Sequence, residues 1–344
     1  MFLCMEELKK ILRCRSSWFV VLAILVIQVV TVVSGYKDME SKCGNIAAYN
    51  AYADSYNGTL NRELVDSDDI QKMKKGSYQR AGNTVEDYFY ERYLAAIVNA
   101  DEYKAKYQDG NEPKYWNAVG INNLVQNLTT SVSACLVFIG LIFGLHPIFL
   151  KDTENGMDKI IYSSYDGRKQ ILKAKCIAAM AYEAAWVTIY YVSIAFLTIV
   201  VFRNTSALNI PVNFIPCLSF CTVHIRVWQY LWISYFLLLM ASTFVTAFMV
   251  MVYAKVKRIM AGWAIGIALT FIPMFVPKNG NVGRFFCILP SVFSNASLIV
   301  AENLKLKCMG TEISILGLGT ILLAVGTVLV FLLLRKIFWI GRVE

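Results

Sequence analysis

The sequence predicts an all-α polytopic membrane protein that crosses the bilayer six times. Hydrophobic residues make up 57% of the chain and charged residues only 17%, whereas soluble domains average roughly 45–50% and about 25%. The mean hydropathy of the chain is +0.51. Six apolar runs approach or exceed the roughly 20 residues that a spanning helix needs. These runs are 17–33, 130–150, 176–202, 227–253, 260–276 and 313–334.

Residues 1–16 predict a short helix that lies along the cytoplasmic face of the membrane. Met5, Leu8 and Leu12 share one helical face, while Lys9 and Arg13 lie elsewhere. This pattern is typical of interfacial helices. The apolar run that follows is longer than the roughly 7–15 residues of a secretory signal, and five more spans follow it. We therefore expect an uncleaved first transmembrane helix.

The segment 36–125 is the only part of the sequence long enough to form a separate soluble domain. Thr84 can cap a helix that runs to about Tyr107, and an earlier helix is expected at 68–75. The domain is therefore predicted to be small, mostly helical and extracytoplasmic. It holds 11 of the 19 tyrosines. Their amphipathic rings could bind a ligand, but a small core packed at the membrane interface is the favoured interpretation.

The last third of the chain contains the least regular membrane segments. The run 260–276 is as short as 17–33, the other shortest of the six, and Pro273 near its end predicts a kink or a re-entrant course. Residues 277–312 contain apolar pieces that are too short to cross a bilayer. We expect them to form an outer interfacial or re-entrant segment before the last span. The final residues, 335–344, are predicted to be a cytoplasmic tail.

The distribution of lysine and arginine orients the chain with both termini in the cytoplasm. The segments predicted on that side hold 16 of the 33 basic residues, and the two short outer loops hold six. The segments predicted in the cytoplasm are 1–16, 151–175, 254–259 and 335–344, and the two outer loops are 203–226 and 277–312. This signal, with attraction to membrane lipid headgroups, accounts for much of the net charge of +9. We expect a multi-pass protein of the cell membrane and no nucleic-acid partner.

A few small or polar residues inside the spans have special meaning. Glu183 is the one acidic residue within a span. An intramembrane carboxylate indicates a proton or cation site, unless it is solvated near the interface or paired with a lysine such as Lys175. Gln28 and Gln229 are expected to form hydrogen bonds between helices. Gly140-x-x-x-Gly144 and Gly262-x-x-x-Gly266 favour close helix packing within the chain.

The sequence offers no catalytic, cofactor or metal motif. A dinucleotide fingerprint, a zinc-protease HExxH and a phosphate loop are all missing. The two histidines, His146 and His224, are predicted on opposite sides of the membrane, which disfavours a shared catalytic site. The nine cysteines have no metal-binding spacing. Those expected outside could form a disulfide, but its pairing stays open. We expect neither an enzyme nor a cofactor in this chain.

A charged island at 151–175 separates the second and third spans. Glu154 and Gly156 indicate a turn, and Ile160 and Ile161 belong to a short apolar face that follows. Gly167 and Arg168 then lead into the next span, whose first lysines, Lys175 included, are expected at the headgroups. The island is either a basic loop that lies on the membrane or a helix that docks into a groove of a partner. The residues alone favour neither.

This island resembles the region between the second and third helices of type-2 ABC exporter permeases. The resemblance is carried by Glu154-Asn155-Gly156, Ile160-Ile161-Tyr162-Ser163-Ser164, Gly167-Arg168, Ile171-Leu172-Lys173-Ala174-Lys175, and Glu6-Glu7-Leu8-Lys9-Lys10-Ile11-Leu12-Arg13 before the first span. The six-span layout and the broken apolar segment before the last span are also similar. The resemblance covers the membrane part, while 36–125 is an elaboration found in some members.

The resemblance implies the membrane subunit of a bacterial-type exporter. In that family a coupling helix in the island docks on a separate ATP-binding subunit, and two permease chains form the pathway between them. The missing phosphate loop agrees, since ATP would be hydrolysed by the partner. Peptides or antibiotics are the implied cargo, and sodium, lipid or polysaccharide stay open. The implied coupling positions are Glu154, Gly156, Ile160, Ile161, Gly167 and Arg168.

Two other classes of function stay open at this point. The chain could be a membrane sensor or immunity protein that binds a ligand through 36–125 without moving it. It could also be an integral membrane enzyme that acts on lipid-linked substrates. An enzyme predicts a polar cluster at one membrane face, and beyond Glu183, His224 and Arg226 the sequence shows little of this kind.

Overall fold

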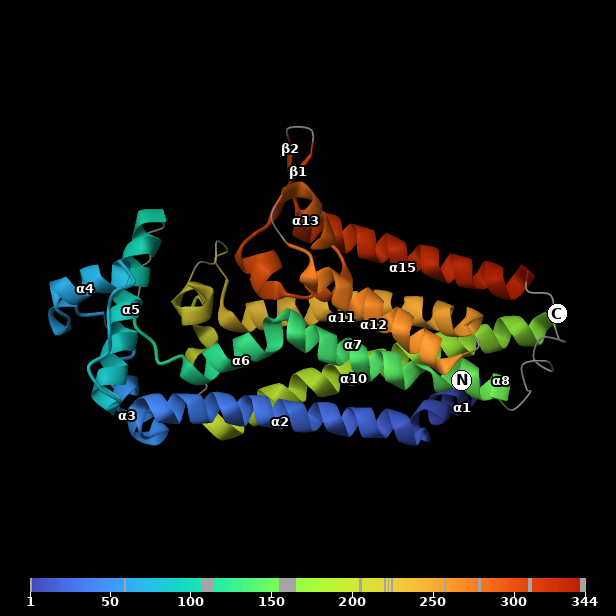
Figure 1. Ribbon diagram of the computed structural model, residues 1–344, viewed down its shortest axis with the longest axis horizontal. Coiled ribbons are helices and arrows are strands. Elements are labelled where there is room, and N and C mark those ends of the chain that lie inside the picture. The colour runs from blue at the N-terminus through green and yellow to red at the C-terminus, as the bar shows by residue number, and fades with distance from the viewer. Residues whose placement is uncertain are drawn as a thin grey trace. The chain divides into compact units, whose positions relative to one another are not determined.

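The computed structural model describes most of the chain as helices joined by short connections (Figure 1). The described residues are 2–58, 60–106, 114–154, 165–203, 206–219, 221, 223, 225–256, 258–277, 280–308 and 311–340. They divide into two compact units. Unit 1 comprises Met1–Ile27, Thr129–Ser193 and Ile233–Glu344, and unit 2 comprises Gln28–Leu128 and Ile194–Trp232. The divisions fall inside three long helices, α2 (Arg15–Cys43), α10 (Tyr165–Phe202) and α11 (Val227–Lys255).

Unit 1 is the apolar unit. Besides parts of the three long helices, it contains α1 (Phe2–Leu12), α7 (Ser131–Leu145), α8 (Pro147–Glu154), α12 (Ile259–Phe275) and α15 (Ile315–Ile340). Among the described residues, five stretches are long and apolar enough to cross a membrane: Arg15–Cys43, Ser131–Asp152, Lys169–Phe202, Val227–Lys255 and Ile315–Lys336. Helix α12 is apolar but has only 17 residues. The sixth span therefore stays a prediction.

Helix α7 and the turn after it form the centre of unit 1. In an apolar 18-residue window of the stretch Ser131–Asp152, 78% of the residues are buried, compared with 56% or less in the corresponding windows of the other four stretches. Large apolar side chains are exposed on outer helices, among them Phe19 at 75% and Phe275 at 81%. A unit with buried polar groups and an exposed apolar surface is suited to lipid rather than water.

The glycines of α7 accept aromatic side chains from α10. The positions where Gly140 and Gly144 would carry a Cβ are filled by the side chains of Trp186 and Tyr182. Trp186 Nε1 donates a hydrogen bond to the Val137 carbonyl at 3.0 Å, and Tyr182 Oη donates to the Gly140 carbonyl at 3.3 Å. Aromatic rings can approach the α7 backbone this closely only because two positions one turn apart, Gly140 and Gly144, have no side chain.

The glycines of α12 are used in the same way. Tyr253 of α11 fills the space beside Gly262, and its Oη donates to the Ile142 carbonyl of α7 at 2.6 Å. Ile142 itself packs against Gly266. Both small-residue motifs therefore serve contacts within this chain, as expected from the sequence.

The segment between α12 and α15 contains the one departure from an all-helical fold among the described residues. It holds α13 (Gly280–Phe286), α14 (Pro290–Phe293), the π-helical turn η5 (Ser297–Ala301) and the antiparallel strands β1 (Lys305–Cys308) and β2 (Thr311–Ser314). Lys305 pairs with Ser314 in the ladder. Figure 1 shows this hairpin projecting at the start of α15. The turn and α14 are buried within unit 1, and their insertion into a membrane stays a prediction.

Unit 2 contains short helices packed around the end of α2. They are α3 (Ile46–Asp54), η1 (Arg62–Leu64), α4 (Ser67–Lys74), α5 (Val85–Lys106), α6 (Val119–Thr129), η2 (Ser206–Asn209), η3 (Val212–Phe214) and η4 (Pro216–Leu218). The predicted cap of α5 is present, because Thr84 Oγ1 accepts from the Asp87 N–H at 3.1 Å and donates to its carboxylate at 2.6 Å. Helix α2 continues beyond the predicted span 17–33 to Cys43.

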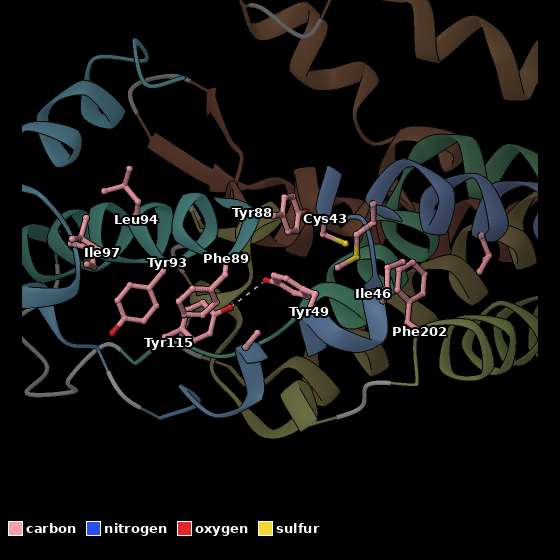
Figure 2. Packing of buried hydrophobic residues seen from close by; sticks show 14 residues of the cluster. Cys43, Ile46, Tyr49, Tyr88, Phe89, Tyr93, Leu94, Ile97, Tyr115 and Phe202 are labelled. Carbon is pink, nitrogen blue, oxygen red and sulfur yellow. Dashed lines mark hydrogen bonds between the residues drawn. The ribbon is translucent and has the colours of Figure 1, made fainter. Parts of the chain in front are cut away.

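Tyrosines form the core of unit 2 (Figure 2). Tyr49, Tyr93 and Tyr115 are each at most 4% exposed. Tyr49 Oη and Tyr115 Oη share a hydrogen bond of 3.3 Å, and the Tyr93 and Tyr115 rings have centroids 5.1 Å apart. Desolvation raises the pKa of Tyr115 to about 12. The Tyr115 phenol therefore remains neutral, and the packed rings hold α3 and α5 together.

We expect Gly144→Val to destabilise unit 1 because the new side chain would meet the Tyr182 ring. Overpacking of this kind costs about 1–3 kcal/mol, which is measured as a lower midpoint of thermal unfolding in detergent. The matched control is Gly317→Val in α15, where a Cβ meets nothing within 4 Å. Equal midpoints for the two variants would contradict the packing described here.

Candidate functional site

The candidate site is the charged island and the two helices that lead into and out of it. Helix α8 ends at Glu154 and α10 begins at Tyr165. Of the predicted coupling positions, Glu154 lies at the end of α8, and Gly167 and Arg168 lie in the first turn of α10. Gly156, Ile160 and Ile161 lie outside the described residues. The structure thus describes the two helical ends of the island, whereas 155–164 lie outside the described residues.

Four charged residues meet at the two ends of the island; we call Glu7, Lys10, Asp152 and Lys175 the charge cluster. Lys175 Nζ contacts the Asp152 carboxylate and donates to the Ile148 carbonyl. The same ammonium lies 3.6 Å from Glu7 Oε2 and 4.5 Å from the centroid of the Phe149 ring. Lys175 is only 3% exposed, Asp152 7% and Glu7 6%. The cluster therefore fastens α8 to α10 from inside the fold.

Lys10 brings α1 into the cluster. Its Nζ lies 2.8 Å from Glu7 Oε1 and 2.7 Å from Asp152 Oδ1. Burial alone would lower the pKa of Lys10, but hydrogen bonds to Asp152 and Glu7 raise it above the ordinary value. Two carboxylates thus face two ammonium groups, and the cluster is neutral as a whole. Neutrality matters because an uncompensated buried charge costs several kcal/mol.

The structure corrects the expected position of Lys175. The sequence placed this lysine at the lipid headgroups, but its side chain is buried and paired. Helix α1 also has two kinds of contact. Ile11 is 1% exposed within unit 1, whereas Met5 and Leu12 are 52% and 47% exposed. The short helix therefore buries one side in the protein and leaves apolar side chains available for lipid.

Glu183 lies deeper along α10 and has hydroxyl partners. Ser242 Oγ donates to Glu183 Oε1 at 2.5 Å, and Thr243 Oγ1 donates to the same oxygen at 3.3 Å. The residue is 2% exposed. The sequence interpretation that this carboxylate is solvated or paired with a lysine is therefore wrong. Gln229 likewise has a different role, because its Oε1 accepts from the Arg226 N–H at the start of α11.

The other candidate groups do not assemble into a catalytic or metal site within the described residues. His146 packs its ring against Trp263 at 5.7 Å, and His224 lies outside the described part. The eight cysteines whose side chains the structure describes are free. No group of three or more His, Cys, Asp or Glu side chains that could hold a metal occurs in the described part of the chain.

Comparison with protein families decides what kind of membrane protein this is. The family model described as "ABC-2 family transporter protein" matches residues 1–282. The chain belongs to this family. The match includes α1, the charge cluster and the whole island. No curated protein and no solved structure matches this chain. The family resemblance carried by the island motifs is thus confirmed. The chain is an ABC-2 transporter protein with several apolar helices.

We expect Lys175→Met to destabilise this ABC-2 protein strongly. Asp152 and Glu7 would be left buried with one ammonium between them, and breaking a buried ion pair costs about 3–5 kcal/mol. Unfolding in detergent measures the loss. Lys173→Met is the matched control, because Lys173 is exposed two residues earlier on the same helix.

A second variant tests whether charge balance is the cause. Asp152→Leu combined with Lys175→Met removes one charge of each sign and leaves Glu7 with Lys10. We expect this double variant to recover most of the lost stability. Recovery would fail if Lys175 acted only through its packing against Phe149, and the ion-pair explanation would then be wrong.

Proposed function

We propose that this chain is the permease subunit of an ABC exporter, driven by a separate ATP-binding subunit. The observation that carries the proposal is the family match over residues 1–282, which includes the island. The second support is the charge cluster, since it fixes both helices that flank the island. A partner that pushed on the island would therefore move α8 and α10 together.

The proposed topology has six spans with both termini in the cytoplasm of the cell and the chain embedded in the cell membrane. Helix α12 is the sixth span; its 17 residues cover about 25 Å, a little less than the roughly 30 Å hydrocarbon core. The basic residues at 1–16, 151–175, 254–259 and 335–344 support this orientation. In this arrangement the 36–125 segment lies outside.

The proposed mechanism transmits ATP-driven motion through the island. Coupling residues Glu154, Gly156, Ile160, Ile161, Gly167 and Arg168 would dock on the ATP-binding subunit, and a second permease chain would complete the pathway. Helix α10 continues from Arg168 to Phe202 with neither glycine nor proline, the usual causes of kinks. Such a helix moves as a rigid body, and two bundles can rock between inward- and outward-open states. Peptides or antibiotics are the proposed cargo.

We expect Arg168→Ala and Gly156→Leu to uncouple ATP hydrolysis from export without preventing membrane insertion. Both changes alter the docking surface but leave the charge cluster intact. The measurement is ATPase activity and cargo export in vesicles that contain both subunits, and we expect at least a tenfold fall in cargo exported per ATP. Lys169→Ala is the control, because Lys169 is exposed beside Arg168.

A binding experiment examines the partner itself. Deletion of 153–168, which leaves Asp152 of the charge cluster in place, is expected to abolish co-purification of the ATP-binding subunit, whereas Arg168→Ala is expected only to weaken it. Retention of the partner after the deletion, or normal coupling in both point variants, would remove the island from the mechanism.

We also propose that the Glu183 carboxylate takes part in transport. Its partners in the described part are hydroxyls, so its charge is not used in an ion pair there. Glu183→Gln keeps an oxygen that can accept from Ser242, and stability is expected to change by less than about 1 kcal/mol. Export is expected to fall at least tenfold, whereas Glu302→Gln at an exposed position leaves it unchanged. Normal export by Glu183→Gln would show that Glu183 only fastens α10 to α11.

A further inference from the structure

Unit 2 contains two neighbouring cavities, and Arg92 of α5 lines both. The larger cavity has a volume of about 440 Å³, and α2, α5, α6 and η4 contribute to its wall. The smaller has a volume of about 60 Å³ and lies against Tyr49, Tyr115 and Trp116. Arg92 and Asn122 belong to both walls. Pockets that bind small ligands commonly measure about 300–1,000 Å³, so the larger cavity is of a suitable size.

Arg92 forms no ion pair with an acid among the described residues. Its Nε and Nη2 donate to Tyr88 Oη at 3.1 and 2.8 Å, and this acceptor is a neutral phenol. The neighbouring carboxylate, Glu91, faces Arg80 at 3.3 Å. The acid on the wall of the larger cavity, Asp38, is paired with Lys42 at 2.6 Å. A guanidinium has five N–H donors, and three of those on Arg92 have no described acceptor.

A second polar group in the smaller cavity also lacks a partner within the described part of the chain. Asn213 is 4% exposed and lines the cavity. Its Nδ2 donates to the Cys221 carbonyl, while its Oδ1 has no donor. Buried polar atoms are satisfied in the great majority of cases, so an orphan of this kind calls for an explanation. A ligand N–H group would supply the missing donor.

Arg92 and Asn213 together indicate the chemical groups of a ligand that would fit the cavities. Arg92 presents a planar fork that suits a carboxylate, which it can bind through two parallel hydrogen bonds. Asn213 Oδ1 is a buried acceptor that an N–H donor of the ligand would satisfy. The larger cavity adds the side chains of Asn122, Asn123 and Gln126, and amide groups of this kind can pair with a peptide backbone. The pair Asp38–Lys42 contributes no net charge, so a single negative charge on the ligand matches Arg92.

We propose that these cavities form a binding site for a carboxylate with an adjacent N–H group, as at the free C-terminus of a peptide or in an acylated amino acid. Arg92 binds the carboxylate and Asn213 Oδ1 accepts from the N–H. This site goes beyond the proposed transport role, and its occupancy needs neither ATP nor the ATP-binding subunit. Failure of the binding experiment and failure of the transport experiments are therefore separate results.

The test uses the purified full chain in detergent and the probe N-acetyl-alanyl-alanine, with saturation-transfer NMR as the measurement of binding. We expect this probe to bind, and its C-terminal amide to bind at least tenfold more weakly because Arg92 loses its anionic partner. Arg92→Lys keeps the charge but loses the fork, and binding should fall at least tenfold. Arg80→Lys is the matched control, because Arg80 flanks the same Tyr88 ring but lines neither cavity.

Two further arms identify the source of the carboxylate and the role of Asn213. Displacement of the probe by N-acetylalanine as well as by the peptide would show that acylated amino acids suffice; displacement by peptides alone would assign the site to peptide C-termini. N-acetyl-alanyl-lactic acid has an ester oxygen in place of the terminal N–H. We expect it to bind the unaltered chain more weakly than N-acetyl-alanyl-alanine does. We expect Asn213→Ala to bind the two probes equally. Equal binding of acid and amide, undiminished binding by Arg92→Lys, or no binding of the acid would each overturn the proposal.

Discussion

The rest of unit 1 depends on one buried cation. Lys175 is 3% exposed and lies between Asp152 and Glu7, and such an ammonium can stay charged in the interior only if its partners hold their positions. The partners come from different helices, α8 and α1, and Lys10 ties them again from the other side. The charge requirement thus converts four separate side chains into one joint. Movement of any of these helices by a few ångströms would expose an unpaired charge to the apolar interior.

The glycines and aromatic rings around α7 serve the same end by different chemistry. Lipid provides no hydrophobic force that would drive one apolar helix against another, so close packing and hydrogen bonds must hold the bundle. Trp186, Tyr182 and Tyr253 supply both, since each ring fills a glycine notch and donates to a backbone carbonyl of α7. The charge cluster fixes one end of α10, and these rings fix the helix further along. A stiff α10 is what a push from the island would require.

The sequence predicted the features that depend on hydropathy and local capping, and it missed those that depend on distant partners. Long apolar runs indicated the spanning helices, and Thr84 marked the start of α5 as found. The predicted span 17–33 did not show that the helix continues to Cys43, because Met39 and Cys43 pack against partners in the core of unit 2 that are distant in sequence. Lys175 resembled a headgroup anchor, because the acids that bury it lie 23 and 168 positions earlier. The four-residue strands were too short to give a period.

The candidate functions meet on one helix. Helix α10 begins beside the island, carries Lys175 and Glu183, and ends at Phe202, whose side chain belongs to the tyrosine core and also lines the larger cavity. No glycine or proline, the residues that most often kink a helix, interrupts it after Gly167. If the island moves α10 as proposed above, ligand binding that altered the position of Phe202 would act on the same helix. Linkage between two such sites is reciprocal in binding free energy: an ATP-driven state that shifts α10 must change the affinity for the carboxylate by the factor with which the carboxylate favours that state.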